Sequence, residues 1–98
     1  MDVTLLYFDG CPGWQVAAER LETLTDEYDF QLAYRKVETP EEAEELSFRG
    51  SPTVVVDGRD AFARGDEPVG LSCRLYETPN GQASAPTIEQ LREVLDGR

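Results

Sequence analysis

The 98-residue chain carries 20 acidic and 9 basic side chains and no histidine, which gives a formal net charge of −11. Nucleic-acid binding rests on Lys and Arg neutralising phosphates, so this charge argues against nucleic acid, and equally against anionic membrane surfaces. The lack of histidine excludes Cys–His and Ser–His catalysis and every zinc site that contains His. Two cysteines alone cannot close a structural zinc site, so we expect neither a metal nor a cofactor.

A chain of this length is expected to form one domain, residues 1–98, around a single core. Its longest apolar run is far too short to span a bilayer, and its N-terminus leads into a strand pattern without a signal-peptide core. We therefore expect a cytoplasmic protein. In such a reducing compartment, two cysteines are expected to be free or transiently bonded rather than a disulfide framework.

The stretch around Cys11 marks a change from strand to helix. Residues 3–8 form an apolar, β-branched and aromatic run that is typical of a central strand covered on both faces. Apolar residues then recur three and four positions apart over residues 14–28, which predicts an amphipathic helix that frays near residues 27–29. Pro12 suits the first helical position, so we expect Cys11 at or next to the N-cap.

This position favours Cys11 as a nucleophile. Its sulfur is expected to face the free N–H groups of Gly13 and Trp14, and these donors stabilise a thiolate together with the positive helix end. Cysteines so placed can have pKa values lowered from about 8.5 into roughly the 3.5–7.5 range. The alternative is that Cys11 packs as a small hydrophobe just inside the turn, as free cysteines often do.

The chain continues with a strand and a short helix. Alternating polarity over residues 30–35 predicts a half-exposed strand at the edge of the sheet. A helix should follow over residues 40–47, because Thr39 and Glu42 have the spacing of a capping box and Pro40 suits the first helical position.

The second half of the chain predicts two more strands. Residues 54–56 form one, with Pro52 at its start, where a strand tolerates proline. Residues 59–70 predict a surface loop, and long loops inside compact domains are often functional. Residues 71–76 alternate and predict a fourth strand, before a turn at residues 79–81.

The last predicted element is a helix with Thr87 as its N-cap and Gln90 three residues on. The predicted order of elements is therefore β-α-β-α-β-β-α, which is an α/β fold.

This order and two motifs resemble the thioredoxin-like superfamily over nearly the whole chain. Residues 11–14, Cys-Pro-Gly-Trp, look like the C-x-x-C redox motif of that family with tryptophan in place of the second cysteine, a C-P-x-W motif. Residues 48–58, Phe-Arg-Gly-Ser-Pro-Thr-Val-Val-Val-Asp-Gly, look like the segment around the family's cis-proline. The resemblance implies a mixed four-stranded sheet flanked by helices, in which the third strand begins beside the end of the first.

The resemblance also implies a substrate site. Pro52 would lie against Cys11 after a cis Ser51–Pro52 bond. The backbone of Ser51, with Thr53 beside it and residues 12–14 opposite, would be the edge on which an extended peptide or thiol substrate lies. The alternative is that Pro52 only begins a strand.

Two departures from the family pattern bear on chemistry. Leu5 stands where many thioredoxins carry a buried acid, and Trp14 replaces the second cysteine. Without a neighbouring thiol, Cys11 is expected to attack a disulfide or other electrophilic sulfur and to need an external thiol to resolve the adduct. The partners would be disulfide- or thiol-bearing proteins or a low-molecular-weight thiol. Trp14 would shield the sulfur or stack on a substrate, or else only pack the helix.

Cys73 is the alternative resolving thiol. In a fourth strand antiparallel to the third, it would lie toward the end of the sheet away from Cys11, whereas a disulfide needs Cα atoms within about 7 Å. We therefore expect Cys73 to be a buried structural cysteine.

Three functions stay open. The first is a monothiol thiol-disulfide oxidoreductase with Cys11 as its nucleophile, and the second is a non-catalytic thioredoxin-fold binding module. The third is thiol-dependent handling of a soft metal or an organomercurial, because similar short thioredoxin-like proteins are sometimes labelled alkylmercury-lyase-like. That chemistry needs two thiolates and a proton donor, for which Cys11, Cys73 and Asp9 are the candidates, and it requires Cys73 to approach Cys11.

Overall fold

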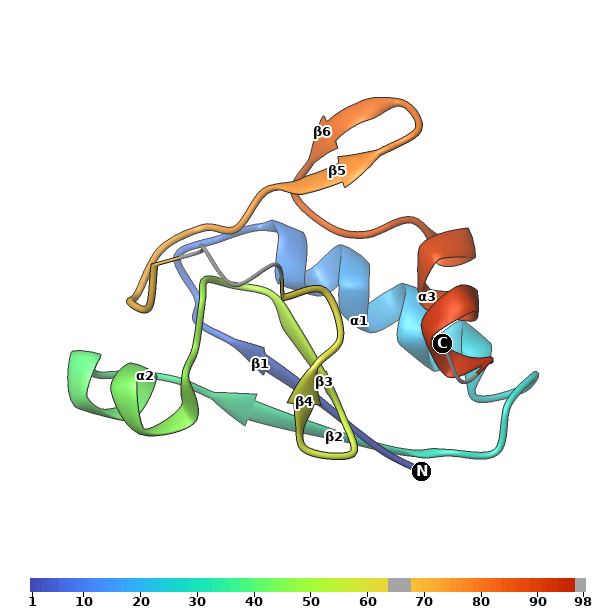
Figure 1. The fold of residues 1–98 in the computed structure, drawn as a ribbon, viewed down its shortest axis with the longest axis horizontal. Coiled ribbons are helices and arrows are strands. Elements are labelled where there is room, and N and C mark those ends of the chain that lie inside the picture. The colour runs from blue at the N-terminus through green and yellow to red at the C-terminus, as the bar shows by residue number, and fades with distance from the viewer. Residues whose placement is uncertain (64–67, 97–98) are drawn as a thin grey trace.

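The computed structural model describes residues 1–63 and 68–96. A mixed sheet in the order β2-β1-β3-β4 forms its centre, a separate hairpin pairs β5 with β6, and three helices complete it (Figure 1). The elements in chain order are β1 (Asp2–Tyr7), α1 (Gly13–Leu24), β2 (Gln31–Lys36), α2 (Pro40–Leu46), β3 (Thr53–Val56), β4 (Arg59–Asp60), β5 (Tyr76–Thr78), β6 (Gly81–Ala83) and α3 (Ile88–Leu95).

The central strand is β1, as the apolar run at residues 3–8 predicts. It pairs in parallel with β2, which forms an edge as expected, and antiparallel with β3. Leu6 near the end of β1 lies opposite Thr53 at the start of β3. The third strand therefore begins beside the end of the first, where α1 also begins.

The two faces of β1 belong to different apolar clusters. Val3 and Leu5 face α1 and α3, whereas Leu6 faces the opposite side. The buried residues of the first cluster are Val3, Leu5, Ala17, Ala18, Leu21, Leu24, Val54, Ala85, Leu91 and Leu95. Those of the second are Leu6, Val37, Ala43 and Phe48. Because both faces are covered, β1 reads as a continuous apolar run rather than an alternating one.

Side-chain caps define the starts of α2 and α3. The predicted capping box of α3 is confirmed: Gln90 N–H donates to Thr87 Oγ1 at 3.1 Å, and Thr87 N–H donates to Gln90 Oε1 at 2.9 Å. In α2, Thr39 Oγ1 accepts from Glu42 N–H at 3.1 Å, but the Glu42 carboxylate accepts from Glu38 N–H at 2.8 Å. In α2 the Glu42 carboxylate therefore accepts from the residue before the N-cap, and not from the N-cap Thr39 as in a capping box.

The start of α1 lies one residue later than predicted. Pro12 is the N-cap rather than the first helical residue, and the helix begins at Gly13. Cys11 is next to the N-cap, which is one of the two positions expected for it.

The prediction of a fourth strand over residues 71–76 is wrong. The fourth strand of the sheet is the short β4, which lies in the segment predicted as a loop, and β5 begins only at Tyr76. Residues 64–67 of that predicted loop lie outside the described residues. The alternation at 71–76 misleads because Arg74 faces inward and Leu75 outward: Arg74 is 6% exposed and Leu75 60% exposed.

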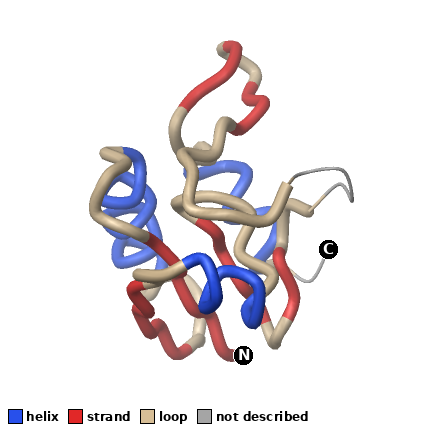
Figure 2. Tube along the Cα trace, turned by 90° about the vertical axis from the view of Figure 1, so that its left-hand side faces the viewer, coloured by secondary structure: helices blue, strands red, loops and turns tan. Residues whose placement is uncertain are grey.

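The predicted turn near residue 80 is confirmed, since Thr78 pairs with Gly81 across it. The β5–β6 hairpin that this turn closes stands clear of the central sheet in both views (Figure 1, Figure 2). In the part of the chain that the structure describes, no helix is long and apolar enough to cross a bilayer.

Candidate functional site

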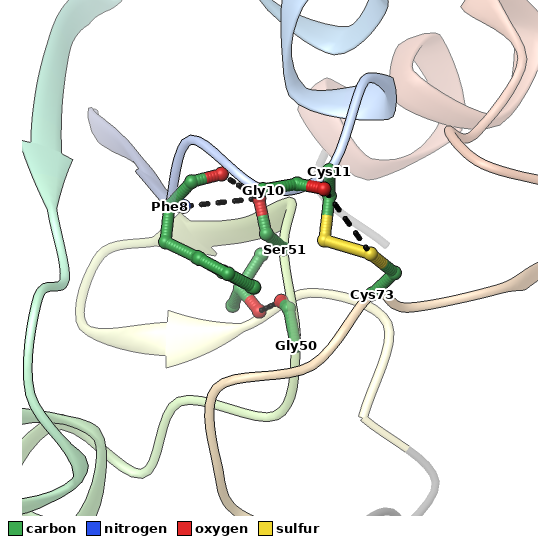
Figure 3. The surroundings of a disulfide bond; sticks show 7 residues. Phe8, Gly10, Cys11, Gly50, Ser51 and Cys73 are labelled. Atoms are coloured by element: carbon green, nitrogen blue, oxygen red, sulfur yellow. Dashed lines mark hydrogen bonds between the residues drawn. A yellow bond between two sulfur atoms is a disulfide. The ribbon is translucent and has the colours of Figure 1, made fainter.

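A disulfide joins Cys11 to Cys73, with their Cα atoms 5.5 Å apart and a sequence separation of 62 residues (Figure 3). The expectation that Cys73 lies away from Cys11 is wrong, and so is the expectation that it is buried. The reason is the direction of the chain. Residue 73 forms a single parallel bridge with Ser51, just before β3, instead of opening an antiparallel strand. It therefore lies at the end of the sheet where α1 begins.

Backbone hydrogen bonds hold the segment that carries Cys73. Ser51 N–H donates to the Ser72 carbonyl at 2.8 Å, and Arg74 N–H donates to the Ser51 carbonyl at 3.1 Å. One step earlier, Gly70 N–H donates to the Phe48 carbonyl at 3.0 Å. The backbone edge of Ser51, expected to receive a substrate, is thus occupied by residues 72–74 of the same chain.

The predicted substrate edge has the backbone form that the resemblance implies, because the Ser51–Pro52 bond is cis. Ser51, Pro52 and Thr53 are all buried. Ser51 Oγ accepts a hydrogen bond from Phe8 N–H at 3.1 Å, which ties the start of β3 to the end of β1 (Figure 3). Thr53 Oγ1 donates to the Gly50 carbonyl at 2.6 Å. These bonds fix the backbone on which the Cys73 segment lies.

Arg74 is a site residue that the sequence patterns did not single out. Its Nη1 donates to Asp60 Oδ2 at 2.8 Å and to Thr53 Oγ1 at 3.3 Å, and its guanidinium carbon lies 5.0 Å from the Tyr76 ring centroid. Tyr76 in turn donates its hydroxyl to the Pro52 carbonyl. The signal in the sequence was a basic residue within the alternating segment 71–76. Arg74 anchors the residue next to Cys73 to β3 and β4.

Two glycines allow backbone segments to meet around the disulfide. A Cβ on Gly13 would lie 2.1 Å from the Ser84 carbonyl oxygen, so the chain before α3 rests directly on the first turn of α1. Gly50 has φ +110, and a Cβ there would lie 3.0 Å from Arg74 Cβ. Both positions therefore need glycine. The sequence analysis gave Gly13 a role only as an N–H donor.

The two half-cystines differ in exposure. Cys11 is 1% exposed, whereas Cys73 is an exposed residue. Cys73 Sγ lies 3.9 Å from the Gly10 carbonyl oxygen (Figure 3). Because the Cys11 sulfur is bonded to Cys73 here, the expected contact of a Cys11 thiolate with the N–H groups of Gly13 and Trp14 concerns the reduced protein and stays a prediction.

Trp14 packs within the protein. Its ring stacks on Tyr7 with centroids 4.1 Å apart and an interplanar angle of 22°, and it contacts the cluster under α1. Of the roles considered for this tryptophan, packing is the one the structure shows. The stack joins the end of β1 to the first turn of α1, on either side of Cys11.

Asp9, the candidate proton donor, forms an ion pair. Its Oδ2 lies 2.7 Å from Lys36 Nζ, and the hydrogen bond to this carboxylate raises the pKa of Lys36. Asp9 therefore lies at the surface as the partner of Lys36, and its side chain is 65% exposed.

The chain matches no known family, no curated protein and no solved structure. Within residues 1–63 and 68–96, no group of three or more His, Cys, Asp or Glu side chains is placed to hold a metal ion. The fold and the site define an α/β domain with a mixed sheet. In it, a disulfide joins Cys11, next to the N-cap of α1, to Cys73 in the segment 72–74 that is bonded to Ser51.

Proposed function

We propose that this protein is a thioredoxin-like thiol-disulfide exchange protein whose redox couple is Cys11 and Cys73. The observation that carries the proposal is the disulfide between a cysteine beside a helix N-cap and a cysteine on a segment held by backbone bonds. The thioredoxin-like assignment is supported by β1 pairing in parallel with β2 and antiparallel with β3, with α1 beginning where β1 ends.

The couple supplies a resolving thiol within the chain. After reduction, one thiolate attacks a substrate disulfide and expels a substrate thiolate, and the second thiolate then attacks the resulting mixed disulfide to reform the 11–73 bond. Two electrons pass to the substrate in each cycle. The monothiol hypothesis rested on a distant Cys73, and we replace it because the Cα atoms are 5.5 Å apart.

The surroundings favour rapid resolution. The bonds from Ser51 to Ser72 and Arg74, with the buried Arg74–Asp60 pair, hold residue 73 in place independently of the disulfide. A thiol held beside its target reacts at a high effective concentration. The helix end stabilises a thiolate at Cys11, and the first turn of α1 has no acidic side chain to oppose it. We place this exchange in a reducing compartment such as the cytoplasm, with protein thiols or a small thiol as partners.

Turnover with glutathione as reductant and a disulfide peptide as substrate tests the proposal. Cys11→Ser and Cys73→Ser should each lose turnover, while Ser84→Ala, which retains both thiols, should keep it. Turnover that persists in Cys73→Ser would restore the monothiol hypothesis. A folded wild-type protein without turnover would support the non-catalytic binding module instead.

The closeness of the two sulfurs also favours a second candidate function, binding of a soft metal ion by the reduced pair. Thiolates select soft ions such as Cu(I), and a two-coordinate site needs no third ligand. Cleavage of an organomercurial would also need a proton donor, and Asp9 is ion-paired with Lys36. We therefore propose binding without carbon–mercury cleavage.

Titration of the reduced protein with Hg(II), followed by thiolate charge-transfer absorbance, should show one ion per chain. Cys73→Ser should lose this stoichiometry. Phenylmercury acetate should release no benzene, and benzene release would contradict the restriction to binding.

A further inference from the structure

We infer that Cys73, and not the motif cysteine Cys11, is the sulfur that exchanges with the substrate, while Cys11 is the leaving and resolving sulfur. The inference rests on the proposed exchange function and adds which of the two sulfurs reacts with the substrate. It reverses the roles suggested by the Cys-Pro-Gly-Trp motif, in which Cys11 would meet the substrate.

Access is the first observation. An incoming thiolate must reach one sulfur of the disulfide, and access decides which one it attacks. Cys11, next to the N-cap of α1, is 1% exposed, whereas Cys73 is exposed between the exposed residue Ser72 and the buried Arg74. Leu75, one residue further on, is 60% exposed. The open side of the disulfide is therefore the side of Cys73.

The surroundings of the two sulfurs are the second, independent observation. Attack on Cys73 expels the Cys11 thiolate, which lies next to the N-cap of α1, where N–H groups without helical partners and the helix dipole stabilise negative charge. Attack on Cys11 would expel a Cys73 thiolate instead. Cys73 Sγ lies 3.9 Å from the Gly10 carbonyl oxygen, whose partial negative charge disfavours an anion. A thiol of lower pKa leaves faster, so the first route is preferred.

The step balances with a substrate dithiol as the reductant. A substrate thiolate bonds to Cys73 Sγ, the 11–73 bond breaks, and its electron pair leaves on Cys11. The second substrate thiolate attacks the substrate sulfur of this mixed disulfide, which releases Cys73 as a thiolate that takes a proton from water. The substrate is oxidised to a disulfide and the protein is reduced. By microscopic reversibility, reduction of a substrate disulfide passes through the same adduct on Cys73.

Trapping the adduct in the wild-type protein tests which cysteine forms the mixed disulfide, and it needs no substitution. The oxidised protein is mixed with excess glutathione, quenched with acid at short times and alkylated, and the tryptic peptides are analysed by mass spectrometry. Trypsin separates the two cysteines, since Arg20 and Arg59 lie between them. We expect glutathione on Cys73 and the alkyl group on Cys11, in at least tenfold excess over the reverse pattern. In urea, where the fold no longer shields Cys11, the excess should disappear.

Adducts mainly on Cys11, or equally on both residues, in the folded protein would overturn the inference and leave the exchange function intact. A disulfide that glutathione opens in urea but at neither sulfur in the folded protein would overturn the exchange function itself, and the inference with it.

Discussion

Ser51 and Cys73 form a parallel bridge, and this one pairing places Cys73 beside Cys11. Ser51 uses both of its backbone groups, its N–H to the Ser72 carbonyl and its carbonyl to the Arg74 N–H. The same residue is tied to the end of β1 through its hydroxyl and Phe8 N–H. A change in the docking of residues 72–74 should therefore act directly on the disulfide.

Removal of the disulfide should lower the stability of the protein. The bond joins residues 62 positions apart, and disulfides typically contribute about 2–4 kcal/mol by restricting the unfolded chain. Urea unfolding of Cys73→Ser should show a loss of this size. Wild-type protein reduced with dithiothreitol is the matched control and should show the same loss. Equal stability of the oxidised and reduced forms would contradict the prediction.

Arg74→Met should be strongly destabilising, because it leaves the Asp60 carboxylate, whose side chain is 13% exposed, without its buried partner. Breaking a buried pair in this way costs about 3–5 kcal/mol. The control is Arg92→Met, which breaks the exposed pair with Glu27 and should cost far less, because solvent screens exposed ion pairs.

Both variants are compared with wild type by urea unfolding. The reduced Arg74 variant should also reform the 11–73 disulfide more slowly, because the segment beside Cys73 loses its anchor. Equal losses of stability in the two variants would show that burial of the Arg74 pair has no energetic consequence.

Gly13→Ala should destabilise the turn that holds Cys11. The added Cβ would lie 2.1 Å from the backbone oxygen of Ser84, which no side-chain rotation can relieve. Overpacking of this kind typically costs about 1–3 kcal/mol, which thermal melts would detect. Gln15→Ala, at an exposed position of the same helix, is the control and should be nearly neutral. A melting temperature of Gly13→Ala at or above that of wild type would contradict the close contact with Ser84.

Stability should fall at high pH partly through Tyr34. Partial desolvation and the hydrogen bond from its hydroxyl to Glu22 raise the pKa of Tyr34 to about 12, above the ordinary value of about 10. The folded protein thus holds this proton more tightly than the unfolded chain, so its stabilising effect is complete below pH 10 and is lost as the pH rises toward 12. Between pH 9 and pH 11.5, the urea midpoint should fall less in Tyr34→Phe than in wild type. Equal declines in the two proteins would contradict the assignment.

Local patterns predicted most of the fold around the site. The apolar run of β1, the stripe of α1 and the cap at Thr87 were all readable, because each depends on residues within a few positions of one another. That β3 begins beside the end of β1 was instead implied by the resemblance of the segment around Pro52 to the thioredoxin-like superfamily, and the register of Leu6 with Thr53 agrees with it.

The position of Cys73 was not readable in the same way. It depends on a bridge to Ser51 and on a buried pair between Arg74 and Asp60, contacts that join residues 22 and 14 positions apart. The alternation at residues 71–76 indicated the wrong inner face, because Arg74 faces inward only when Asp60 and Tyr76 are there to receive it. A pattern of hydrophobicity contains no information about such a partner.

A redox titration of the folded protein tests the central claim most directly. The protein is equilibrated in glutathione buffers of graded potential, quenched with acid, alkylated and weighed intact by mass spectrometry. If Cys11 and Cys73 form one redox couple, chains should carry two alkyl groups or none, and the oxidised fraction should follow a two-electron dependence, with a tenfold change in ratio for about 30 mV. Cysteines that are alkylated independently of each other, or that bind glutathione separately without forming the 11–73 bond, would contradict the claim.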